Sequence, residues 1–161
     1  MKRTTQAQGY KAHILVKGCN QKKDIDFEEI FSLVVNMTSI RAIFYLTVEQ
    51  DLEVEHLNVK TVFLHGDLEE EIYMEQPEGF VEPGKEPLVW RLKKSHYGLK
   101  QAPRLWYKKF DLFMAHHNFI KTSAYHCVFM KNYKNGNSII LLLYVNDMLI
   151  VGKNKMKIDA L

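Results

Sequence analysis

The stretch S-I-I-L-L-L-Y-V-N-D-M-L-I-V-G, residues 138–152, decides the fold class. Its apolar or β-forming residues run to Val145, stop for the polar residues Asn146 and Asp147, and resume at Met148. Two such runs around a short polar pair predict a β-hairpin in a buried sheet. Asn and Asp are common in turns, so the pair by itself indicates only a turn. The alternative interpretation is a hairpin that presents acidic side chains to metal ions.

The rest of the chain alternates between strand and helix patterns. Asn135–Gly136 predicts a second hairpin, because a type I′ turn needs positive φ at both central residues. This hairpin joins residues 126–133 to residues 138–145. Further strands are expected, from their composition and flanking turn residues, at residues 10–18, 53–64, 70–76 and 88–94.

Two segments show the apolar spacing of amphipathic helices. One covers residues 36–51, and the other runs from Gly98 to about His117. The expected core stripe of the second helix is Leu99, Trp106, Phe110, Phe113 and Met114. Since helices are mixed with hairpins, the sequence predicts an α+β fold with helices packed on one face of a largely antiparallel sheet.

The composition is that of one globular domain. The chain has 161 residues, 47% hydrophobic and 25% charged, and its net charge of +3 permits a nucleic-acid partner without requiring one. The two cysteines are far apart, which favours reduced thiols in an intracellular protein, in cytoplasm or nucleus alike. We expect no signal peptide and no membrane partner, since no apolar run approaches the roughly 20 residues of a membrane helix. Residues 1–9 are polar and aperiodic and are expected to be disordered.

Basic residues recur on one edge of the second predicted helix. Lys100, Arg104 and Lys108 follow one another at intervals of one helical turn. They form either an ordinary solvated face or a stripe that tracks the phosphates of a nucleic acid. The acidic residues at 67–71 are more typical of a solvated surface.

The order of these pieces is specific to one family. Residues 10–42, 56–86, 90–111 and 139–155 together resemble the reverse transcriptase of Ty1/copia-type LTR retrotransposons, nearly continuously from about residue 10 to residue 159. The resemblance implies a right-handed polymerase fold, in which residues 10–161 are part of the fingers plus most of the palm. It also implies a truncated domain, with the thumb, RNase H domain, protease and integrase of the Pol polyprotein missing.

The resemblance assigns a metal site to the palm. In this family two Mg²⁺ ions, held by palm carboxylates, serve the addition of a dNTP to an RNA or DNA primer-template. The first carboxylate heads the motif D-V-K-T-A-F-L, and two more form the D-D of Y-V-D-D. Here the motifs read N-V-K-T-V-F-L and Y-V-N-D, so Asn58 and Asn146 replace two aspartates and only Asp147 matches. The backbone of Val59 is a further candidate ligand.

Other motif positions match the family more closely. Phe63 matches the aromatic residue that packs under the nucleotide sugar, and Gln101 matches the glutamine that contacts the incoming nucleotide. Lys11 and Lys17 lie on the finger strand that faces the triphosphate. His13 stands where the family has an arginine, which weakens phosphate neutralisation at neutral pH.

The two asparagines change the expected chemistry. Mg²⁺ favours anionic oxygen, whereas an amide offers a neutral one. One carboxylate must then serve two ions with four positive charges, so we expect poor magnesium binding and a catalytically inactive copy. The alternatives are a non-catalytic nucleic-acid-binding remnant and a decayed open reading frame without a role. Polyprotein domains supplied in trans are the further partners that the resemblance implies.

Overall fold

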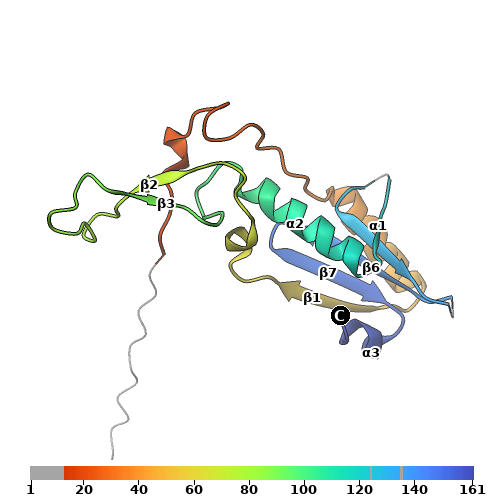
Figure 1. Cartoon of the computed structure of the whole chain (residues 1–161). Helices are drawn as coiled ribbons and strands as arrows, with labels where there is room; N and C mark the ends of the chain where they lie inside the picture. Colours follow the sequence, from red (N-terminus) through yellow and green to blue (C-terminus); the bar gives the residue numbers. More distant parts are fainter. Residues whose placement is uncertain (1–12, 124, 135) are drawn as a thin grey trace, which may run out of the picture.

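The chain forms a five-stranded antiparallel sheet, helices on both of its faces, and a separate two-stranded hairpin (Figure 1). The structure, a computed structural model, describes residues 13–123, 125–134 and 136–161. The disorder expected for residues 1–9, and the position of Lys11, lie outside the described residues. With 3₁₀ helices written as η, the elements in chain order are η1 (Gly18–Asn20), α1 (Met37–Glu49), β1 (Glu53–Asn58), η2 (Val62–His65), β2 (Tyr73–Glu75), β3 (Val89–Arg91), α2 (Ala102–His116), β4 (Ile120–Lys121), β5 (Val128–Asn132), β6 (Ser138–Tyr144), β7 (Asp147–Gly152) and α3 (Lys155–Ile158).

The large sheet has the strand order β1-β7-β6-β5-β4, and all neighbouring strands are antiparallel. Strands β6 and β7 form the hairpin predicted at residues 138–152, with Tyr144 paired to Asp147. The β5–β6 hairpin is also present; Gly136 has a φ of +77°, whereas Asn135 lies outside the described residues. The α+β class and the antiparallel sheet are therefore confirmed.

The expectation that helices cover one face of the sheet is wrong, and strand β6 shows why. On one face Leu141 and Leu143 pack with Trp106 of α2. On the other face Leu142 packs with Ile40 of α1. Successive strand residues point to opposite faces, so a strand covered on both faces needs apolar residues at every position. The unbroken apolar run of β6 is the consequence.

Helix α2 begins later than predicted. It starts at Ala102 instead of Gly98, because Gly98 has a φ of +95° and Pro103 is placed in the first helical turn. Phe113, expected in the core stripe, is instead 52% exposed. Its ring lies against His117 at the end of the helix, with 4.1 Å between the ring centroids.

The strand expected at residues 10–18 is absent from the described part of that segment. The backbone there docks on the turn before α2, where the Val16 amide donates to the Tyr97 carbonyl at 2.8 Å. A Cβ on Gly18 would lie 1.9 Å from the Gly98 carbonyl oxygen, and one on Gly98 would lie 2.0 Å from that of Val16. Only glycine permits so close an approach of two backbones.

The remaining strands are shorter than expected. The strand predicted at residues 53–64 ends at Asn58, because Thr61 takes a positive φ of 55° and leads into η2. The segments 70–76 and 88–94 pair as β2 and β3, next to which the Leu92 amide donates to the Ile72 carbonyl at 2.9 Å. This hairpin extends away from the large sheet (Figure 1). Within the described ranges, no helix combines the length and the apolar character needed to cross a bilayer.

The two cysteines test this packing. Cys127 is 2% exposed and packs with Leu142, and burial raises the pKa of its thiol to about 11, whereas Cys19 is exposed. The thiolate is the reactive form.

We therefore predict that iodoacetamide near neutral pH alkylates Cys19 and leaves Cys127 unmodified until urea is added, as measured by mass spectrometry. Equal alkylation of both cysteines without urea would contradict the described core.

Candidate functional site

The turn between β6 and β7 is anchored from two sides. Val145 has a φ of +57°, an unusual value for a β-branched residue. Its carbonyl oxygen accepts a hydrogen bond from the Trp106 indole Nε1 at 2.7 Å. The carbonyl of Asn146 accepts from the backbone amide of Val59 at 2.8 Å. Helix α2 and the residue after β1 thus fix the position at which Asp147 starts strand β7.

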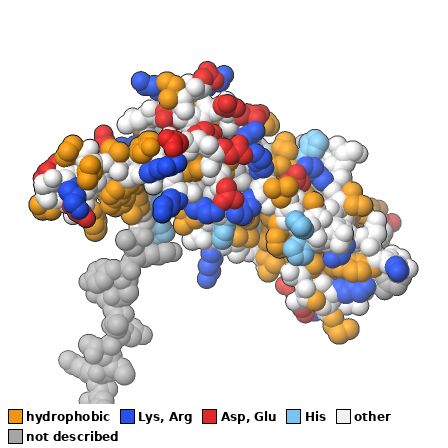
Figure 2. Space-filling view, viewed as in Figure 1, with side chains coloured by type: hydrophobic (Ala, Val, Ile, Leu, Met, Phe, Trp, Pro, Cys, Tyr) orange, Lys and Arg blue, Asp and Glu red, His pale blue; other side chains and the backbone are white. Residues whose placement is uncertain are grey.

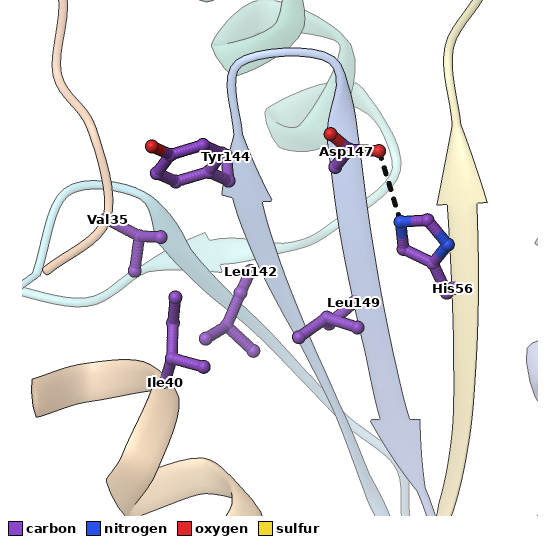
Figure 3. A pocket seen from close by; sticks show the side chains of 7 residues that line it. All are labelled: Val35, Ile40, His56, Leu142, Tyr144, Asp147 and Leu149. Atoms are coloured by element: carbon purple, nitrogen blue, oxygen red, sulfur yellow. Dashed lines mark hydrogen bonds and ion pairs between the residues drawn. The ribbon is translucent and has the colours of Figure 1, made fainter. Parts of the chain in front are cut away.

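Asn58 and Asp147 face each other across β1 and β7. Asn58 ends its strand and Asp147 begins the neighbouring one, in direct register. The Asn58 side-chain Nδ2 donates to Asp147 Oδ1 at 2.7 Å. His56 precedes Asn58 by two residues, so it lies on the same face of β1, and its Nε2 is 3.1 Å from the same Asp147 oxygen (Figure 3). Both neighbours therefore converge on one carboxylate oxygen.

Sequence reasoning did not identify His56. An isolated histidine on a strand carries no signal until the register of the partner strand is known. The spacing of His56 and Asn58, which puts both on one face, was the available hint. Asp147 and His56 also border a small hollow between the sheet and α1, whose other lining residues are Val35, Ile40, Leu142, Tyr144 and Leu149 (Figure 3).

The predicted metal positions lie together, but their donors do not fit a pair of magnesium ions. Asp147 is the only carboxylate among them, and Asn58 turns an N–H group toward it instead of an oxygen. No hydrogen bond links the Asn146 side chain to either residue among the described positions. The described residues contain no group of three or more His, Cys, Asp or Glu side chains that could hold a metal. A Mg²⁺ ion in such sites is held by one or two carboxylates together with water and phosphate oxygens, so a single carboxylate does not suffice for two ions.

Phe63 in η2 and Gln101 just before α2, the two residues predicted to contact the nucleotide, have different surroundings. Phe63 is half-buried, with its ring edge-on to Tyr97 at 5.0 Å between centroids. Gln101 is 1% exposed. Its Oε1 accepts from the Gln21 side chain at 3.0 Å, and its Nε2 donates to the Asp26 carbonyl at 2.9 Å. The Gln101 amide therefore holds the segment around residues 21–26 against the start of α2.

Lys17 and His13 lie in the irregular segment that docks on this turn. Both are exposed, and Lys17 directly precedes η1. Of the two lysines predicted to face a triphosphate, Lys17 is the one within the described residues. No hydrogen bond or ion pair joins it to Asp147 or Asn58 in that part of the chain.

Each residue of the predicted basic edge has a partner within the chain. These partners come from the segment before α1 and from the acidic residues at 67–71, so the basic edge is not a row of free cations. Figure 2 shows Lys and Arg side chains beside Asp and Glu side chains over the middle of this view. The pairs are Lys100 with the Gln21 carbonyl at 3.1 Å, Arg104 with Glu29 at 2.8 Å, and Lys108 with Glu69.

Comparison with known proteins gives one consistent result. A family model described as reverse transcriptase (RNA-dependent DNA polymerase) matches residues 1–161. The Retrovirus-related Pol polyprotein from transposon TNT 1-94 of Nicotiana tabacum is 64% identical over 146 residues, which is 91% of this chain and 11% of the relative. The corresponding polyprotein from transposon RE2 of Arabidopsis thaliana is 40% identical over 157 residues, 94% of this chain and 11% of the relative.

A more distant similarity extends to yeast. The Transposon Ty1-LR3 Gag-Pol polyprotein of Saccharomyces cerevisiae is 27% identical over 146 residues, 90% of this chain and 8% of the relative. No solved structure matches the chain. The chain spans about a tenth of the length of each of these three curated relatives.

The contacts of Gln101 predict a role in stability. Gln101→Ala leaves the Asp26 carbonyl and the Gln21 amide without their partner, and an unsatisfied buried polar group costs about 1–3 kcal/mol. Urea denaturation should therefore show a loss of that size. The control Gln50→Ala removes an exposed side chain and should change stability by less than about 0.5 kcal/mol. Equal stability of the two variants would show that Gln101 does not hold the fold together.

Proposed function

We propose, because this chain belongs to the reverse transcriptase (RNA-dependent DNA polymerase) family, that it is a copia-type reverse transcriptase segment that no longer catalyses nucleotide addition. In this proposal the large sheet with α2 is the palm, and the N-terminal segment with the β2–β3 hairpin is part of the fingers. The ancestral substrates are a primer-template and deoxynucleotides. The observation that carries the proposal is the hydrogen bond from the Asn58 amide to the Asp147 carboxylate.

This hydrogen bond replaces a metal contact with an internal one. The resemblance puts anionic oxygens at positions 58 and 146, and both are neutral amides here. A magnesium ion that approached Asp147 Oδ1 would have to displace the Asn58 N–H and the His56 ring nitrogen from that oxygen. Metal ions contribute several kcal/mol to the transition state of phosphoryl transfer, and about 1.4 kcal/mol corresponds to a tenfold rate. The loss of this term supports an inactive site.

Of the two nucleotide-contact positions, only Gln101 also argues for an inactive site. Phe63 is held beside Tyr97, a short distance along the chain from β1, and is placed to support a sugar ring as the family expectation requires. Gln101 is not free to contact a base, because both ends of its amide bind within the chain. Contact with a nucleotide would require the segment around residues 21–26 to move away.

The contacts do not favour a separate role as a nucleic-acid binder. A duplex that used the basic edge would have to break the Arg104–Glu29 and Lys108–Glu69 ion pairs. Counterion release, the main source of sequence-independent affinity, is smaller for cations that are already neutralised by carboxylates. We therefore propose no second function from this surface.

The test is primer extension by a chimera. Residues of this chain replace the matching segment of the tobacco TNT 1-94 polyprotein, which supplies the remaining domains. On an RNA template with a DNA primer, we predict no extension above background. The pair Asn58→Asp and Asn146→Asp should raise the rate at least about a thousandfold, since it returns two anionic oxygens to the site.

A matched control adds the same charge elsewhere. Asn20→Asp with Asn132→Asp introduces two carboxylates at exposed positions away from the site and should leave the chimera inactive. Extension by the unrestored chimera at a rate close to that of the restored one would refute the proposal.

A further inference from the structure

Three unlike donors converge at the open end of β1 and β7. His56 offers an imidazole nitrogen and Asp147 a carboxylate. Asn58 now turns its side-chain N–H toward Asp147, and rotation of the amide by half a turn brings its oxygen to the same place. The two residues of β1 share one face of the sheet, and Asp147 lies directly opposite Asn58. Magnesium rarely takes imidazole, whereas Zn²⁺, Co²⁺, Ni²⁺ and Cu²⁺ bind it readily.

The separation of the two stronger donors suits a single ion. Two ligands at about 2.0–2.2 Å from one metal lie about 3.0–3.4 Å apart, depending on whether the angle is near 90° or tetrahedral. The distance from His56 Nε2 to Asp147 Oδ1 is 3.1 Å. An ion can therefore take the place of the hydrogen between these atoms without a large movement of either strand.

We propose that His56, Asn58 and Asp147 form a site for a borderline divalent transition metal such as Zn²⁺. The His56 and Asp147 side chains are 59% and 39% exposed, so an ion reaches them from solvent and water completes its coordination. The bound ion joins β1 to β7 where Asp147 starts its strand. This inference rests on the proposed function, because it assumes that the site no longer prefers magnesium.

The direct test is calorimetric titration of the 161-residue chain with ZnCl₂ and, separately, with MgCl₂. We expect one bound Zn²⁺ per chain and no heat of binding with MgCl₂ at the same concentrations. His56→Gln removes the imidazole from an exposed position and should weaken Zn²⁺ binding at least tenfold. His116→Gln removes an exposed imidazole at the end of α2 and should leave the affinity unchanged. Circular dichroism shows whether each variant is folded.

A variant with the opposite effect makes the test independent of lost structure. Asn58→Asp replaces a neutral donor with an anion and should tighten Zn²⁺ binding at least tenfold. The proposal is overturned if the parent chain does not bind Zn²⁺, if His56→Gln leaves the affinity unchanged, or if Asn58→Asp does not increase it. None of these results bears on primer extension, and extension by the unrestored chimera would overturn the proposed function whatever the zinc titration shows.

Discussion

The antiparallel pairing of β1 with β7 places Asn58 opposite Asp147, and the rest of the site follows from that register. The β6–β7 turn stabilises this register. In the turn, the Val145 carbonyl accepts a hydrogen bond from the indole of Trp106 in α2. Trp106 belongs to the core that α2 forms with the sheet. A shift of one residue would turn every side chain of β1 to the other face. The same packing that buries β6 therefore sets which groups meet the Asp147 carboxylate.

Under the proposed function, the replacement of carboxylates by Asn58 and Asn146 has opposite consequences for stability and for chemistry. Clustered carboxylates repel one another and need cations to offset their charge. An amide of nearly the same shape removes that repulsion and donates a hydrogen bond to Asp147 instead. The Asp147 carboxylate thus has hydrogen-bond partners within the chain, and under the proposed function the same amides offer magnesium no anionic oxygen. Stability and activity commonly diverge in this way at functional sites.

Local sequence patterns predicted the elements whose causes are local. The β6–β7 hairpin followed from a polar pair between two apolar runs, and both helices followed from their apolar spacing. The predictions that failed concern features that depend on contacts between residues far apart in the sequence. The docking of Gly18 on Gly98 replaced an expected strand, and the covering of the second face of β6 comes from α1, which is distant from β6 in the sequence. Only the tertiary structure shows that His56 contacts Asp147, that both ends of the Gln101 amide are hydrogen-bonded within the chain, and that the basic edge is ion-paired.

The central claim is that this site satisfies itself internally and does not hold magnesium. The most direct measurement is a MgCl₂ titration of the ¹⁵N-labelled chain, followed through the side-chain amide signals of Asn58 and Asn146. If Asn58 donates to Asp147, these signals keep their positions at millimolar Mg²⁺, apart from the small shifts that an equal ionic strength of NaCl also causes. Saturable shifts of both signals with Mg²⁺, absent with NaCl, would show that the ion binds between them and would contradict the account.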